Sequence, residues 1–79
     1  MHDPLVAFGQ NLRRERRRKG FSQERLALEA EVHRTHISKI ERALCEPGVR
    51  TVARMLAVLK IDGGPLFEST EAAAGEHAR

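Results

Sequence analysis

The 79-residue sequence contains one cysteine, no tryptophan, no tyrosine and only three phenylalanines, and it lacks any long apolar run. The single Cys45 excludes an internal disulfide and is typical of a reducing compartment. A transmembrane helix needs about 20 consecutive, mostly apolar residues, and no segment of this sequence qualifies. We therefore expect a soluble, cytoplasmic protein with no membrane partner.

Side chains for a catalytic or metal site are also scarce. His33 and His36 lie three residues apart, but no cysteine or carboxylate completes a convincing set of metal ligands. The sequence shows no phosphate-binding loop and no Ser/His/Asp arrangement that stands out. We therefore expect no enzymatic activity, no metal, no cofactor and no small-molecule ligand.

Basic residues are concentrated in the first three quarters of the chain. Residues 1–60 contain 13 Lys/Arg against 7 Asp/Glu, a net charge of +6, whereas residues 61–79 contain 1 against 4, a net charge of −3. A basic segment of this kind attracts phosphate groups. At 79 residues the chain can form one domain with a small core, and such domains often gain stability by oligomerising.

Capping residues and apolar spacing predict an all-α domain. Asp3 followed by Pro4 begins a first helix that ends at Gly20, and Ser22 caps a second helix that breaks at Glu31. The chain has no hairpin signal, and apolar periodicity continues downstream. The remaining predicted elements are a helix from about Arg34, a loop at 43–48, a helix at 49–59, a short helix at 62–67 and a frayed tail at 69–79.

The third predicted helix has two different faces. At about 100° per residue its cationic and hydroxyl side chains fall within roughly 140°, and its apolar side chains lie opposite. The outward set is Arg34, Thr35, Ser38, Lys39 and Arg42, and the inward set is His36, Ile37, Ile40 and Glu41. Arginine and lysine suit guanine and phosphate, while serine and threonine suit base edges or a thymine methyl. A helix that reads the major groove and a solvated amphipathic helix both fit this pattern.

Further residues are candidates for contacts with the DNA backbone. Gln23 occupies the first position of the second helix, where its amide and the free N–H groups could hold a phosphate, although a polar first-turn residue is also ordinary. The run RRERRRK at 13–19 could contact phosphates, but cations are favoured at a helix C-terminus in any protein. The expected phosphate-binding residues are Gln23, His33, Arg42, Arg13 and Arg17.

The fourth predicted helix is apolar around much of its circumference. One stripe contains Val52, Ala53, Leu56 and Leu59, and a second face contains Met55 and Val58. A helix of this kind is buried on more than one side, and in so short a chain the second side suits another subunit. We therefore predict a homodimer whose interface includes or borders Met55, Val58, Ile61, Leu66 and Phe67.

The order of these elements resembles the Xre helix-turn-helix family of lambdoid phage repressors and Cro. The resemblance spans roughly residues 5–67 and rests on Arg16 four positions before Gly20, FSQERLA at 21–27, Val32, ISKIER at 37–42, Pro47, Thr51 and Leu56-Ala57. It implies a compact five-helix homodimeric domain at residues 1–68, whose third helix reads bases through Arg34, Thr35, Ser38 and Lys39. It also implies a semi-buried, structural ion pair between Arg16 and Glu41.

Within this family, HRTHISKIERAL at 33–44 is similar to the controller proteins of restriction-modification systems, which are short dimers that regulate their own operon. The similarity implies a transcriptional regulator that binds a (pseudo)palindromic operator in double-stranded DNA. An autoregulating antitoxin and a Cro-like phage regulator remain alternatives. The sequence departs from the family at Glu15, where an apolar residue is usual, and at Lys60, where glycine is usual.

Overall fold

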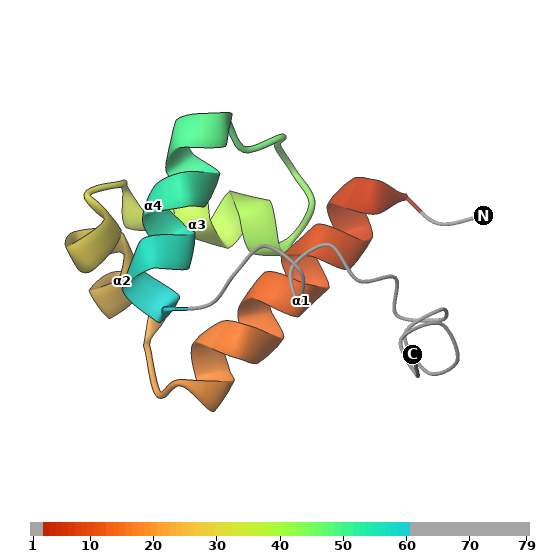
Figure 1. Cartoon of the computed structure of the whole chain (residues 1–79). Coiled ribbons are helices and arrows are strands. Elements are labelled where there is room, and N and C mark those ends of the chain that lie inside the picture. The colour runs from red at the N-terminus through yellow and green to blue at the C-terminus, as the bar shows by residue number, and fades with distance from the viewer. Residues whose placement is uncertain (1–2, 61–79) are drawn as a thin grey trace.

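The computed structural model describes residues 3–60, which form four α-helices and no strand (Figure 1). The helices are α1 (Pro4–Arg18), α2 (Gln23–Ala30), α3 (Arg34–Glu41) and α4 (Val49–Leu59). None of the four has the length and apolar character needed to cross a membrane. The predicted all-α fold is confirmed for this part of the chain, whereas the fifth helix predicted at 62–67 and the tail at 69–79 lie outside the described residues.

The first two helices begin at the predicted capping residues. The Asp3 carboxylate accepts a hydrogen bond from the Leu5 N–H at 2.9 Å, with Pro4 in the first turn. The Ser22 hydroxyl accepts one from the Arg25 N–H at 3.0 Å. These bonds satisfy N–H groups that have no partner within their own helix. The sequence therefore determines where α1 and α2 start.

Helix α1 ends in a turn that suits glycine. The Gly20 N–H donates to the Arg17 carbonyl at 3.0 Å, and the Phe21 N–H donates to the Arg16 carbonyl at 2.9 Å. This pair of bonds places Gly20 at a φ of 80°, a left-handed conformation that glycine adopts without steric cost. The turn sends the chain directly into α2, as predicted from Gly20.

The other three helices end in the same left-handed conformation without a glycine. Glu31 after α2 and Ala43 after α3 both have a φ of 60°, and Lys60 after α4 has a φ of 57°. A residue with a β-carbon is destabilised by roughly 1–2 kcal/mol in this conformation. Lys60 stands where the family usually has glycine. Its backbone has the left-handed conformation that glycine adopts without steric cost.

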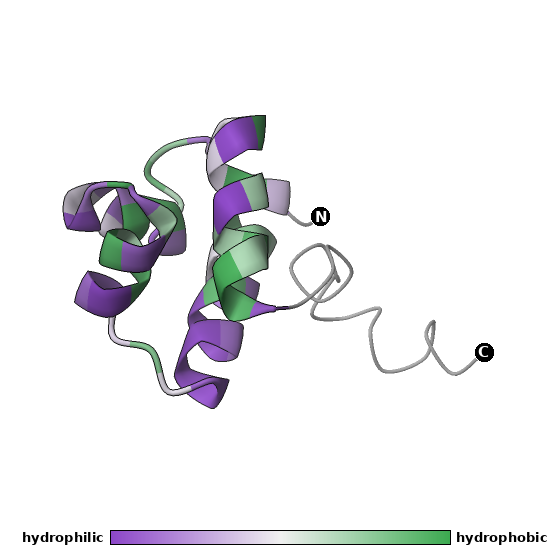
Figure 2. Ribbon diagram, turned by 60° about the vertical axis from the view of Figure 1, so that its left-hand side comes forward, coloured by the Kyte–Doolittle hydropathy of each residue, from purple (hydrophilic) through white to green (hydrophobic). Residues whose placement is uncertain are grey.

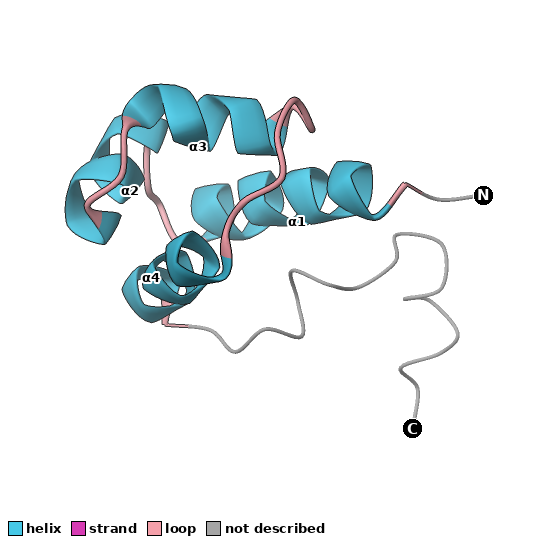
Figure 3. Ribbon diagram, turned by 90° about the horizontal axis from the view of Figure 1, so that it is seen from above, coloured by secondary structure: helices cyan, strands magenta, loops and turns pink. Residues whose placement is uncertain are grey.

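Side chains from all four helices form the core. Helix α2 packs against both α3 and α4, while α1 packs against α3. Figure 3 shows α3 and α4 on opposite sides of the molecule, and in Figure 1 α4 lies in front of α3. The largest fully buried apolar side chains are Leu12, Leu26, Ile37, Ile40, Met55 and Leu59. This packing leaves the far side of α3 free to face solvent.

The fully buried residues of helix α4 come one from each of its two predicted apolar faces. Met55 and Leu59 are 0% and 1% exposed, whereas Val58 is half-buried and Ala53 is exposed. Residues four apart lie on one face of a helix, so Met55 and Leu59 pack inward together. Met55 therefore belongs to the core of this chain, and its place at or beside a dimer interface stays a prediction. Ile61, Leu66 and Phe67 of the predicted interface lie outside the described residues.

Helices α1 and α3 lie very close together at Gly9. A β-carbon on Gly9 would lie 2.6 Å from the Ile40 carbonyl oxygen and 2.7 Å from that of Glu41. Both atoms belong to the backbone, so they cannot be moved by a change of rotamer. The absence of a side chain at Gly9 therefore allows the end of α3 to rest on α1.

The C-terminal half of α1 is strongly hydrophilic (Figure 2), yet two of its charged side chains are buried. Glu15 forms ion pairs with Arg14 at 3.4 Å and with Arg18 at 3.3 Å. Arg16 points instead toward α3, as described below. The apolar stripe of α1 thus continues into charged residues, and Glu15, at a position where the family usually has an apolar residue, is buried beside two arginines.

Candidate nucleic-acid interface

The polar face of α3 is on the surface of the molecule. Arg34, Thr35 and Lys39 are exposed, and Ser38 is partly exposed. Ile37, on the opposite side of the helix, is fully buried. The structure therefore gives α3 the two faces that the helical projection predicts, and the base-reading role of the four polar residues stays a prediction.

A shallow recess links α3 to the start of α2. Gln23, Arg34, Thr35 and Ser38 line a space of about 210 Å³. An amide, a guanidinium and two hydroxyl groups supply several hydrogen-bond donors to this recess. Phosphate oxygens and the acceptor atoms of bases are suitable partners for such donors. The recess thus brings one predicted phosphate-binding residue together with three of the predicted base-reading residues.

A buried ion pair lies beside Gln23. The Arg16 Nε donates to Glu41 Oε2 at 2.6 Å, and Arg16 Nη2 donates to Glu41 Oε1 at 3.1 Å. The two side chains are only 9% and 3% exposed. Arg16 Nη1 also donates to the Phe21 carbonyl at 2.7 Å, and Gln23 Nε2 donates to Glu41 Oε1 at 3.1 Å. These bonds tie α1, α3 and the start of α2 together.

The hydrogen bond from Gln23 to Glu41 is not among the contacts predicted from the sequence. The two residues are 18 positions apart and lie on different helices, so neither periodicity nor capping patterns relate them. A clue was present, because Glu41 is a carboxylate on the inward face of α3 and therefore requires more than one donor when buried. Gln23 supplies one of those donors.

A second recess lies on the other side of Thr35. Its space of about 430 Å³ is lined by His33, Thr35, His36, Lys39 and Cys45. His33 is exposed at the N-cap of α3, while His36 is half-buried. Within residues 3–60, no group of three His, Cys, Asp or Glu side chains is arranged to hold a metal ion. This recess adjoins the polar face of α3, and His33 and Lys39 are exposed polar side chains at it that could contact DNA.

The structure divides the predicted phosphate-binding residues into two groups. Gln23 and His33 line the two recesses of α3, and Arg42 is exposed directly after that helix. Arg13 and Arg17 belong to a separate hollow on α1. The other residues of that hollow are Gln10, Arg14 and Arg18. The first group therefore adjoins the base-reading candidates, whereas the second group does not share a recess with them.

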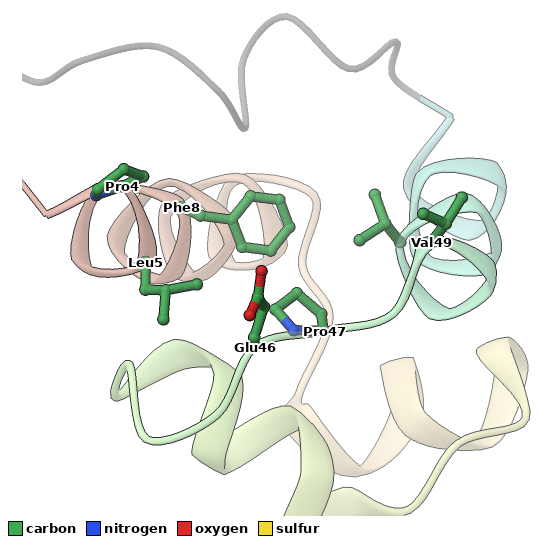
Figure 4. A pocket seen from close by; sticks show the side chains of 7 residues that line it. Pro4, Leu5, Phe8, Glu46, Pro47 and Val49 are labelled. Carbon is green, nitrogen blue, oxygen red and sulfur yellow. The ribbon is translucent and has the colours of Figure 1, made fainter.

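An apolar hollow of about 380 Å³ lies between the start of α1 and the start of α4 (Figure 4). It is lined by Pro4, Leu5, Phe8, Glu46, Pro47, Val49 and Val52. The one charged residue among them is a glutamate, so this hollow has no cation for a phosphate. It is separate from the recesses of α3, and none of the residues predicted to bind DNA lines it.

Comparison with known sequences identifies a family and a relative. The family described as "Helix-turn-helix domain" matches residues 7–68 of the chain. The HTH-type transcriptional regulator SlrR of Bacillus subtilis (strain 168) is 36% identical over 63 residues, which are 78% of this chain. Those residues correspond to 41% of SlrR, so the chain spans less than half the length of that relative.

Solved structures show the same fold. The restriction-modification controller protein C.AhdI from Aeromonas hydrophila superposes with a TM-score of 0.77 at 35% identity, over 80% of this chain and 96% of that protein. The hypothetical transcription factor NHTF from Neisseria gives a TM-score of 0.83 at 28% identity, covering 91% and 83% of the two chains. A mutant of the controller protein C.Esp1396I gives 0.79 at 25% identity, covering 96% and 99%.

Proposed function

The chain belongs to the helix-turn-helix domain family, and from this premise we propose that it regulates transcription by binding a specific DNA operator. The observation that carries the proposal is the exposed polar face of α3, which shares a recess with Gln23 at the start of α2. The relative SlrR and the controller protein C.AhdI are regulators by name. We propose no enzymatic activity for the chain.

In the proposed complex, α3 lies in the major groove of DNA. The groove is about 12 Å wide and accepts an α-helix, and each base pair presents a distinct set of donors and acceptors there. The Arg34 guanidinium can bind a guanine through two parallel hydrogen bonds, and Lys39 can bind guanine through one. Thr35 and Ser38 are short side chains that contact bases only when α3 approaches closely.

Contacts with phosphates would fix α3 in the groove. The Gln23 amide and the free N–H groups at the start of α2 are suited to one phosphate, and His33 and Arg42 at the two ends of α3 are suited to others. Arg13 and Arg17 lie in the separate hollow on α1, so we assign them mainly to long-range attraction of DNA. These contacts position the helix, while the base contacts select the sequence.

We propose that two copies of the chain bind together. A two-fold symmetric dimer would place two α3 helices in successive major grooves about 34 Å apart and would read a (pseudo)palindromic operator. We propose that the DNA-binding and dimerisation domain comprises residues 1–68 and that 69–79 are a tail outside it. Val58 on α4 is half-buried and retains surface for this interface, which we propose to be completed by Ile61, Leu66 and Phe67.

The biological system we propose is a restriction-modification operon. Support comes from C.AhdI, a restriction-modification controller protein that matches this chain over 96% of its own length at 35% identity. Methyltransferase and endonuclease genes beside the gene for this chain would support the assignment. A neighbouring toxin gene would contradict it and favour an antitoxin, and a prophage setting would favour a Cro-like regulator.

The test of the DNA-binding proposal is selection of bound DNA from a random pool by the wild-type chain and by Arg34→Ala. We expect the wild type to enrich a two-fold symmetric site. Arg34→Ala should lose about 1–3 kcal/mol of discrimination at one base pair of each half-site. Arg54→Ala is the matched control, because it removes the same charge from the exposed surface of α4 and should leave base preference unchanged. An identical preference in Arg34→Ala would remove Arg34 from base reading.

A further inference from the structure

We propose that Glu41 is a positioning residue for DNA binding, because its carboxylate sets the orientation of the Gln23 amide. Gln23 Nε2 donates to Glu41 Oε1 at 3.1 Å. An ionised carboxylate only accepts hydrogen bonds, so the nitrogen of the amide must face Glu41 and the oxygen must face away. The inference rests on the proposed function, because it explains how the Gln23 amide is oriented for the proposed contact with a DNA phosphate.

The orientation matters because a phosphate also accepts hydrogen bonds and does not donate them at neutral pH. A glutamine amide has two N–H donors on one nitrogen. When one donor is bound to Glu41, the other remains for an acceptor in the recess that Gln23 shares with Arg34 and Ser38. In the flipped orientation, the amide oxygen would replace that nitrogen and would repel a phosphate oxygen. Glu41 therefore selects the orientation that suits DNA.

The carboxylate is itself held in place by Arg16. Arg16 uses Nε and Nη2 for the two oxygens of Glu41, at 2.6 and 3.1 Å, and Nη1 for the Phe21 carbonyl at 2.7 Å. Phe21 lies two residues before Gln23, so one guanidinium fixes both the backbone that leads into α2 and the acceptor that binds the Gln23 side chain. The ion pair thus connects the packing of α1 on α3 to the DNA-facing surface.

A double-mutant cycle in operator affinity tests this role. Gln23→Ala should weaken binding by about two- to tenfold, the net effect of one hydrogen bond. Glu41→Gln keeps the shape but can donate as well as accept, so the Gln23 amide is no longer oriented and binding should weaken to a similar extent. In the Gln23→Ala background, Glu41→Gln should have little further effect. Equal losses in both backgrounds would show a purely structural role and would overturn the inference.

Two controls make the cycle specific. Glu46→Gln removes the same charge from an exposed position in the loop between α3 and α4, beside the apolar hollow and away from the start of α2, and it should not weaken binding. Each variant is compared at a temperature where circular dichroism shows it to be folded. If the wild-type chain selects no DNA sequence, the proposed function fails and this inference fails with it. If the wild type binds DNA while the cycle is additive, only the inference fails.

A measurement on the free wild-type protein covers the case in which Glu41→Gln does not fold. Hydrogen exchange of the Gln23 side-chain amide can be followed by NMR without any variant. We expect one of its two Nε2 hydrogens to exchange more slowly than the other, and more slowly than those of the exposed Gln10. Exchange of both Gln23 hydrogens at the rate seen for Gln10 would show an unrestrained amide and would overturn the inference.

Discussion

This fold needs glycine for two reasons: at one position there is no space for a β-carbon, and at another φ is positive. Replacing Gly9, Gly20 and Gly48 by alanine, one at a time, separates the two effects. At Gly9 the new β-carbon would lie 2.6 and 2.7 Å from two backbone carbonyl oxygens of α3, whereas ordinary contact begins at 3.4 Å. At Gly20 nothing lies within 4 Å, but φ is 80°. At Gly48 neither constraint applies, because no atom lies within 4 Å and φ is −75°.

The expected changes in stability follow from these differences. Gly9→Ala gains about 1 kcal/mol in helix propensity but must separate two backbones, and overpacking typically costs about 1–3 kcal/mol and sometimes more. Because both opposing atoms are backbone, we expect a cost at the upper end of that range, about 3 kcal/mol, and so a net loss of about 2 kcal/mol. This loss is roughly 8–16 °C in Tm for a domain of this size. Gly20→Ala should lose about 1 kcal/mol through its backbone conformation. Gly48→Ala should change stability by less than about 1 kcal/mol.

Urea unfolding followed by circular dichroism at 222 nm gives the three free energies at one temperature. The prediction requires the order Gly9→Ala, then Gly20→Ala, then Gly48→Ala, from the largest loss to the smallest. A Gly9→Ala variant as stable as the wild type would show that α3 does not rest on α1 as described. It would also remove the basis for the position of Glu41, whose own carbonyl is one of the two contacted atoms.

Further predictions concern single side chains and are checked by the same unfolding measurement. Arg16→Met should lose about 3–5 kcal/mol, since it leaves Glu41 buried without its partner, whereas Arg16→Met combined with Glu41→Leu should recover most of that loss. Ser22→Ala should lose about 1 kcal/mol with the cap of α2. Glu31→Gly should gain up to about 1 kcal/mol by relieving the left-handed residue after α2, and an unchanged midpoint would argue against that strain.

The start and end of each described helix were predictable to within a residue or two, because local chemistry determines them. Asp3, Ser22 and Gly20 perform the capping and turning roles that their types favour. The two faces of α3 were predictable for a similar reason, since periodicity along one helix requires no knowledge of its neighbours.

The features that could not be predicted from the sequence depend on contacts between helices. Met55 and Leu59 are both buried although they come from different predicted apolar faces, because periodicity along one helix does not show where its neighbours lie. Nothing in the sequence around Gly9 indicates that backbone carbonyls of α3 lie close to it. The bond between Gln23 and Glu41 likewise exists only after α2 and α3 have been placed.

The central claim is that the outward face of α3 and the start of α2 form the DNA-binding surface. NMR chemical-shift mapping on addition of the selected operator tests it most directly. We predict that the largest perturbations occur at Gln23, Arg34, Thr35, Ser38 and Lys39, and that the exposed Arg54 of α4 stays unperturbed at salt concentrations that suppress non-specific binding. Perturbations confined to α4 or to the arginine-lined hollow of α1, with α3 unchanged, would contradict the claim.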